Sequence, residues 1–251
     1  GGVRAATDDQ LISVAPAEFH RLSPAERERF LGHAQRLIGQ VRWEGARGVE
    51  VTDEMILTVA AHAALLAAGF ELHTQPFLYV RSVVLHGGTI VARGHRPGPV
   101  RGVYTSGPQH LAGQSGHGRG PILLDWRTVR RQVDVPDRGV NVVYHEFAHK
   151  LDQLDGVADG MPPLPGRAAR DAWIQTIGTN YRRLRRRGSD GLVRAYGAKN
   201  PAEYFAVTSE LFFLKPVELR ERLPRVYLRL ADFYHQDPAA RREFQYVPGT
   251  K

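Results

Sequence analysis

The chain of 251 residues is 42% hydrophobic and 24% charged, a balance typical of a globular protein large enough to bury a core. It contains no cysteine, which excludes disulfides and thiolate ligands, so any transition metal would have to be held by His, Asp or Glu. No apolar run approaches the roughly 20 residues of a membrane span, and residues 1–7 lack the charged-then-apolar order of a signal peptide. We therefore expect a cytoplasmic protein with no membrane partner.

The formal net charge is +8, which is compatible with acidic protein partners as well as with nucleic acid. The densest basic segment is Arg182-Arg183-Leu184-Arg185-Arg186-Arg187, at the end of an expected helix, where cations complement the helix dipole. No aromatic stacking series and no nucleic-acid recognition motif accompanies it. The segment therefore favours a solvated helix end over a nucleic-acid interface.

The first third of the chain predicts a tail and two helices. Residues 1–15 are typical of a flexible tail, and Ser23-Pro24-Ala25-Glu26 then forms a capping box with Pro at the first helical position. A second helix follows Thr52, with an acidic start and a run rich in Ala and Leu that ends at Gly69. His62 within this run has no partner at a useful ligand spacing, so we interpret it as a core histidine.

The middle of the chain predicts a small sheet and a long loop. β-branched and aromatic residues are concentrated in 77–85, and a Gly-rich turn at 86–89 leads into 90–91, which predicts a hairpin or two sheet strands. Residues 94–120 have the composition of a surface loop, whose three histidines follow no recognised ligand pattern: His95, His110 and His117. A short apolar strand at 120–126 could hold an extended substrate as an added strand, and an interior strand of the sheet is an equally good interpretation.

An HExxH motif at residues 145–149 is the strongest functional signal in the chain. Side chains four residues apart lie on one face of a helix, so His145 and His149 can bind one metal ion while Glu146 lies beside it. Apolar residues at helical spacing around the motif predict that this helix is buried, and Asn141 suits the N-cap position. Because a short motif can arise by chance, an amphipathic helix with two satisfied histidines is the alternative interpretation of the motif alone.

A catalytic metal site usually has a third protein ligand, which in this chain must be His, Asp or Glu. The candidates downstream of the motif are Asp152, Asp155, Glu203, Glu210 and His235. Asp152, three residues after His149, suits a supporting or capping role better than a ligand role. Glu203 and Glu210 are seven residues apart on one face of a helix that Asn200 is predicted to cap, so spacing cannot choose between them. A capping box with Asn200 is the alternative role for Glu203.

Two segments together resemble a known family. They are His145-Glu146-Phe147-Ala148-His149-Lys150-Leu151-Asp152 and Asn200-Pro201-Ala202-Glu203-Tyr204-Phe205-Ala206-Val207-Thr208-Ser209-Glu210. Both are similar to the Mlc titration factor A family of zinc-dependent peptidases, which in turn resembles the catalytic domain of anthrax lethal factor. The likeness extends from about the Ser23 helix to about Asp237. It implies that Glu203 is the third ligand of one Zn²⁺ ion and that Tyr196 is a catalytic tyrosine, with Glu210 on the metal side of its helix.

The mechanism implied by this resemblance is gluzincin-type hydrolysis of peptide or protein substrates through a metal-activated water. Glu146 would take the proton of that water, and Tyr196 would donate a hydrogen bond to the oxyanion. Aminopeptidase action is one form that this activity could take. The resemblance also implies binding to a transcriptional repressor, and the alternative function is a regulatory binding protein that sequesters a transcription factor, with peptidase activity secondary.

The expected fold is α+β, a mainly helical zincin-type metallopeptidase domain with a small mixed sheet beside the HExxH helix. We expect one domain over residues 16–251, acting as a monomer. Within it we expect N-terminal helices at about 23–70, the sheet and loops at about 71–138, and the active-site helices at about 140–240.

Overall fold

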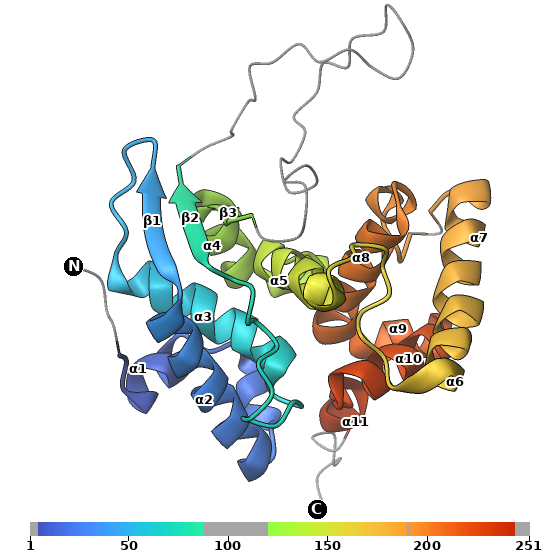
Figure 1. The fold of residues 1–251 in the computed structure, drawn as a ribbon, viewed down its shortest axis with the longest axis horizontal. Coiled ribbons are helices and arrows are strands. Elements are labelled where there is room, and N and C mark those ends of the chain that lie inside the picture. The colour runs from blue at the N-terminus through green and yellow to red at the C-terminus, as the bar shows by residue number, and fades with distance from the viewer. Residues whose placement is uncertain (1–4, 88–119, 190, 244–251) are drawn as a thin grey trace, which may run out of the picture.

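The computed structural model of the protein describes residues 5–87, 120–189 and 191–243. Figure 1 shows two groups of elements on either side of helix α5 (Val142–Asp152): the N-terminal helices and strands on one side, and the C-terminal helices on the other. Helix α5 contacts α3 (Asp53–Ala67) in the first group and α8 (Pro201–Leu214) in the second. The helix of the HExxH motif therefore lies at the centre of the molecule.

The N-terminal group begins earlier than the sequence predicted. Its helices are α1 (Asp8–Ser13), the 3₁₀ turn η1 (Ala17–Arg21), α2 (Pro24–Gln40) and α3. The expectation of a flexible tail through residue 15 is wrong for α1, because Thr7 and Gln10 form a reciprocal capping box and Leu11 is fully buried. The predicted capping box of α2 is confirmed, with the Ser23 amide donating to Glu26 Oε2 at 2.8 Å.

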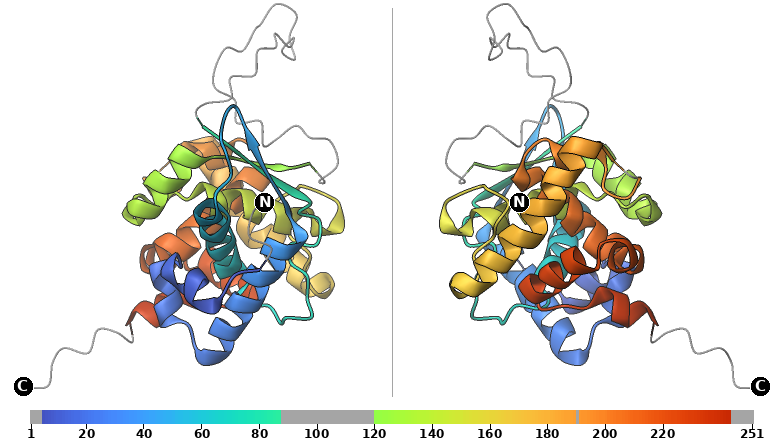
Figure 2. Two further views of the ribbon diagram at one scale, coloured as in Figure 1. Left: turned by 90° about the vertical axis from the view of Figure 1, so that its left-hand side faces the viewer. Right: turned by 90° about the vertical axis from the view of Figure 1, so that its right-hand side faces the viewer.

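A small three-stranded sheet lies beside α5, as predicted. Its order is β1 (Arg42–Ala46), β2 (Ser82–His86) and β3 (Ile122–Asp125), and Figure 2 shows the N-terminal helices below the strands. Both strand pairs are parallel, whereas we expected a mixed sheet. Parallel neighbours need long crossover connections, and α3 lies in the one between β1 and β2. The hairpin expected at 90–91 lies outside the described residues.

The C-terminal group consists of short helices around α8. In chain order the elements after β3 are α4 (Trp126–Asp134), η3 (Pro136–Arg138), α5, η4 (Gln153–Asp155), α6 (Gly166–Trp173), η5 (Ile174–Gly178), α7 (Thr179–Arg187), η6 (Ala195–Ala198), α8, α9 (Pro216–Arg222), α10 (Pro224–Tyr234) and α11 (Pro238–Glu243). The helix expected to end at the arginine-rich segment 182–187 is present, but it is interrupted by η5, a π-helical turn between α6 and α7. Proline at the first position starts α8, α9 and α10, since its missing N–H has no partner there to lose.

The two central helices, α5 and α8, are buried along almost their whole length. Residues 143–152 of α5 and 202–214 of α8 are all buried. Aromatic rings fix α5 on both sides: Phe147 contacts Phe77 with ring centroids 5.0 Å apart, and Tyr144 contacts Phe213 at 5.8 Å. Such packing holds the side chains of both helices in defined positions. None of the helices in the described part of the chain is long and apolar enough to cross a membrane.

Candidate metal centre

The first half of the site is the HExxH helix, which begins where the sequence predicted. The Asn141 side chain accepts hydrogen bonds from the amides of Val143 and Tyr144, at 2.9 and 3.1 Å, and so caps α5. His145 and His149 lie one turn apart on the face that contacts α8, and both are buried. The cap therefore sets the start of the helix, and the start sets which face carries the imidazoles.

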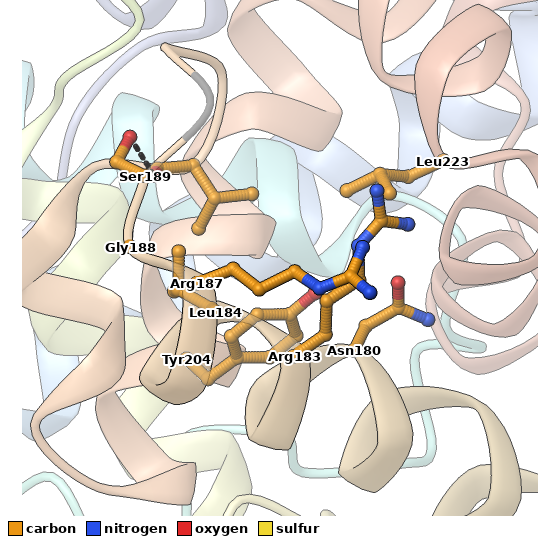
Figure 3. A pocket seen from close by; sticks show the side chains of 9 residues that line it. Asn180, Arg183, Leu184, Arg187, Gly188, Ser189, Tyr204 and Leu223 are labelled. Atoms are coloured by element: carbon orange, nitrogen blue, oxygen red, sulfur yellow. Dashed lines mark hydrogen bonds between the residues drawn. The ribbon is translucent and has the colours of Figure 1, made fainter.

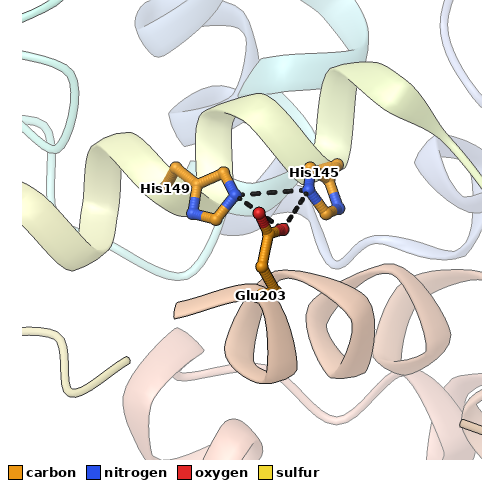
Figure 4. A group of neighbouring side chains, drawn as sticks. All are labelled: His145, His149 and Glu203. Carbon is orange, nitrogen blue, oxygen red and sulfur yellow. Dashed lines mark hydrogen bonds and ion pairs between the residues drawn. The ribbon is translucent and has the colours of Figure 1, made fainter. Parts of the chain in front are cut away.

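The second half is the carboxylate of Glu203, in the first turn of α8. The Glu203 amide donates to Asn200 Oδ1 at 2.8 Å, so Asn200 caps this helix. The Glu203 carboxylate turns towards α5, where Oε2 lies 3.0 Å from His145 Nε2 and 3.3 Å from His149 Nε2 (Figure 4). The structure thus brings together the three residues that the family resemblance proposed as ligands.

These three side chains have the spacing of a metal site. The two Nε2 atoms are 3.2 Å apart, so the triangle has edges of 3.0, 3.2 and 3.3 Å. Tetrahedral bonds of about 2.0–2.1 Å to zinc place neighbouring ligand atoms about 3.3 Å apart, which is close to these edges. Two imidazole nitrogens at this distance cannot both carry a proton. At most one proton lies between them, and a metal ion that replaces this proton could be bound by His145, His149 and Glu203 together.

Glu210, the competing candidate on α8, meets the other nitrogen of His145. Its Oε1 lies 2.7 Å from His145 Nδ1, and its Oε2 accepts the Asn141 amide at 2.8 Å. The side chain is fully buried. When Nδ1–H donates to Glu210 and Nε2 has lost its proton, the electron pair of Nε2 is available to a metal. Glu210 thus orients the imidazole of His145 from outside the triangle.

Arg194 in turn holds Glu210 in place, a contact that the sequence did not predict. Its guanidinium donates to both oxygens of Glu210, with distances of 2.5 and 3.1 Å. A two-pronged contact of this kind fixes a carboxylate and offsets its charge in a buried setting. Arg194 lies 16 residues from Glu210 in the chain, just before η6, and no motif or helical spacing connects the two.

Burial and hydrogen bonding shift the pKa values of the site in opposite directions. Burial disfavours charge on His145, but hydrogen bonds to Glu203 and Glu210 outweigh it and raise its pKa to about 9. Burial likewise opposes ionisation of Glu203, yet its contacts with His145 and His149 hold its pKa below the usual range. In the metal-free protein a proton is thus held where a metal ion would bind, and metal and proton compete.

Two further predicted residues, Glu146 and Tyr196, line a pocket beside this triangle. Tyr196, in η6, donates through its hydroxyl to Glu203 Oε1 at 3.1 Å. The pocket has a volume of about 350 Å³ and reaches from the two helices to α4. It is lined by Thr128, Arg131, Gln132, Val140, Val142, His145, Glu146, Arg194, Tyr196 and Glu210. A substrate in this pocket would meet both Glu146 and Tyr196.

The remaining histidine and carboxylate candidates lie apart from the triangle. His62 is buried with its Nδ1 3.3 Å from the Asn141 side-chain amide, which confirms it as a core histidine. Asp155 accepts the Val157 amide in a local turn, and His235 contacts the Phe70 ring edge to face. The loop histidines at 95, 110 and 117 lie outside the described residues.

A second pocket, of about 160 Å³, lies at the C-terminal end of α7 (Figure 3). Arg183 and Arg187 line it together with Asn180, Ser189 and Tyr204. No histidine or carboxylate is among its described lining residues, so it has no group that could hold a metal ion or move a proton at neutral pH. The HExxH site is therefore the better candidate for catalysis.

Asp152, at the end of α5, is buried but supports a loop. Its Oδ2 accepts the Gly160 amide at 3.0 Å, while its Oδ1 has no hydrogen-bond partner in the described structure. Burial, with smaller contributions from nearby Asp155 and Asp159, raises the pKa of Asp152 to about 7. The side chain therefore anchors the segment after α5.

Asp152→Asn is expected to remove a pH dependence of stability between about pH 4 and pH 7. In this range the unfolded chain releases the Asp152 proton and the folded protein keeps it, so stability falls as pH rises. Each pKa unit corresponds to about 1.4 kcal/mol, so the wild-type loss is a few kcal/mol. Urea unfolding of metal-free wild type and variant at pH 5 and 7.5 measures the difference, with Asp134→Asn, an exposed residue at the end of α4, as control. Parallel pH profiles would show that Asp152 ionises normally.

A mainly helical domain with an HExxH helix facing a buried carboxylate defines a zincin-like metallopeptidase domain. The chain belongs to the glucose-regulated metallo-peptidase family M90, whose family model matches residues 5–235. It is 35% identical over 231 residues to Mlc titration factor A of Edwardsiella ictaluri, covering 88% of this chain and 84% of that protein. It is 33% identical to the Serratia proteamaculans protein of the same name, with the same coverage of 88% and 84%. An uncharacterized protein of Synechocystis is 30% identical over 88% of this chain and 80% of its own length.

Proposed function

We propose that this protein is a zinc-dependent peptidase in which His145, His149 and Glu203 hold the metal ion. The observation that carries the proposal is the triangle of their ligand atoms, buried beside a pocket that also contains Glu146 and Tyr196. A set of two histidines and one glutamate favours zinc among the common divalent metals. When bound, the ion would lower the pKa of a water to about 7 and polarise the substrate carbonyl.

Glu146 would then transfer the proton, and Tyr196 would stabilise the negative charge on the oxyanion. Glu146 follows the first ligand on α5, so its carboxylate is placed to take a proton from the water and pass it to the leaving amine. Tyr196 would turn its hydroxyl from Glu203 to the carbonyl oxygen as negative charge develops there. Burial and the neighbouring Glu203 raise the pKa of Tyr196, so the hydroxyl keeps its proton at neutral pH. The protonated hydroxyl can therefore donate a hydrogen bond to the oxyanion.

Removing the metal is expected to abolish hydrolysis, and one equivalent of Zn²⁺ should restore it. The reason is that, in this proposal, no side chain of the site alone supplies the nucleophile. The measurement is cleavage of internally quenched peptides before and after dialysis against a chelator, with metal content determined by mass spectrometry. A mock-dialysed sample is the control. Undiminished cleavage by metal-free protein would contradict the proposal.

A second candidate function is binding of a transcriptional repressor, with aminopeptidase or other peptidase action secondary. It is favoured by the name Mlc titration factor A, which the relatives from Edwardsiella and Serratia carry. The two functions are compatible. Affinity for purified Mlc, measured for wild type and for Glu146→Gln, separates them: binding by both proteins without cleavage of any peptide would favour the binding role.

A further inference from the structure

The pocket beside Glu146 has a wall that the reaction itself does not require. Thr128, Arg131 and Gln132 lie three and four residues apart, so one face of α4 forms this wall. Gln132 Oε1 accepts the Val142 amide at 2.6 Å, and Thr128 donates to Asp125 Oδ2 at 2.7 Å. Helix α4 is thus tied to the start of α5 on one side and to the end of β3 on the other. The third wall residue, Arg131, lines the same pocket as Glu146.

Among the described residues, Arg131 is the pocket cation for which no ion pair is seen. Arg194, the other guanidinium in the lining, is paired with Glu210. Arg131 is exposed, and no carboxylate of the described residues forms an ion pair with it. The pocket therefore presents a positive charge beside Glu146 that an incoming molecule can meet.

The carboxylates in the same lining already have roles. Glu210 holds His145 and Arg194, and Glu146 is the proposed base. An ion pair with a substrate ammonium group would need a further carboxylate in the lining. The described lining offers none, so the charge pattern fits an anionic substrate group better than a cationic one.

We infer that this pocket binds a carboxylate of the substrate residue next to the scissile bond, and that Arg131 is the specificity-determining residue. The inference rests on the proposed peptidase function. A guanidinium matches a carboxylate in a planar, two-pronged contact, which a lysine or an amide cannot reproduce. The apolar side chains of Val140 and Val142 in the lining would contact the methylene groups that carry this carboxylate. The carboxylate can come from an acidic side chain or from the C-terminus of the peptide.

The test uses metal-loaded full-length protein and peptides that differ at one residue beside the cleaved bond, occupied by Glu, Gln or Lys. Wild type should cleave the Glu peptide with a kcat/KM about 10- to 100-fold higher than the Gln peptide, as one charge-assisted contact allows. Arg131→Gln should remove this preference, and Arg131→Glu should reverse it in favour of Lys. The matched control is Arg130→Glu, since Arg130 is exposed on the same helix but does not line the pocket.

Two further arms identify the source of the carboxylate and provide a readout without turnover. Glu peptides with an amidated C-terminus test the side chain, and Gln peptides with a free C-terminus at that residue test the terminal group. Fluorescence anisotropy with labelled peptides on Glu146→Gln measures binding in each case, with and without the Arg131 substitutions.

The outcomes separate the inference from the function on which it rests. Cleavage or binding that shows no preference for a carboxylate, or one that Arg131→Glu leaves unchanged, overturns the role of Arg131 and leaves the peptidase in place. If no peptide is cleaved by metal-loaded wild type, the proposed function fails, and the anisotropy measurements still decide whether Arg131 selects carboxylates. A preference that Arg130→Glu abolishes equally would show general charge attraction instead of a pocket.

Discussion

Glu146→Gln is expected to lower the rate of peptide hydrolysis by about 10²- to 10⁴-fold, the usual contribution of a general base, while the metal content stays unchanged. Glutamine has the shape of glutamate but cannot accept the proton of the attacking water. Glu146 is also outside the triangle of ligand atoms, so its replacement leaves the proposed metal site intact. Steady-state cleavage of quenched peptides and metal analysis of the same sample measure the two quantities.

The matched control for this variant is Glu221→Gln, an exposed glutamate on α9 that does not line the pocket. It should keep wild-type activity. Cleavage by Glu146→Gln at the wild-type rate would show that another group takes the proton, and the proposed mechanism would be wrong. Loss of metal together with activity would instead place Glu146 among the groups that hold the ion.

Glu203→Ala is expected to weaken metal binding by more than 100-fold, because it removes one of the three proposed ligands. Glu210→Ala should weaken it less, by about 10- to 100-fold, which is typical for a residue that orients a ligand without touching the metal. Competition titrations with a chromophoric chelator measure both affinities. The peptidase activity of each variant should fall in proportion to the metal that it has lost.

Folding controls are needed for this pair, since both glutamates are buried. Glu210→Gln keeps the volume of the side chain and leaves Arg194 a carbonyl oxygen to bind, so it should retain more metal than Glu210→Ala. Circular dichroism and thermal unfolding of the metal-free variants show whether the helices persist. Loss of metal in Glu210→Ala only, with Glu203→Ala fully loaded, would reverse the assignment of the third ligand.

Local signals in the sequence were enough to predict the main helices of the site. The Ser23 capping box begins α2, Asn141 caps α5, and Asn200 with Pro201 begins α8, all as expected. These features depend on hydrogen bonds within three residues along the chain, so the residues themselves contain the information. The same is true of the HExxH face, because four-residue spacing on a helix brings His145 and His149 together wherever that helix lies.

Other features depend on contacts between distant segments, and local patterns did not predict them. Leu11 is buried against the rest of the protein, so α1 forms where a tail was expected. The connection through α3 allows the neighbouring strands β1 and β2 to be parallel. The composition of the strands does not predict their relative direction. The bond between Arg194 and Glu210 depends on how η6 approaches α8, and no sequence spacing relates them.

The two glutamates of α8 show most clearly which properties of the site depend on the local sequence and which depend on the tertiary structure. The sequence by itself determined that Glu203 and Glu210 lie on one helix face, because a separation of seven residues is close to two turns. It left open which of them meets the metal, except through a family resemblance. In the tertiary structure α8 lies against α5 so that Glu203 meets Nε2 of His145 and Glu210 meets Nδ1 of the same ring, an arrangement that supports Glu203 as the proposed ligand. Periodicity along one helix is a local property, whereas the position of two helices relative to each other depends on the packing of the whole core.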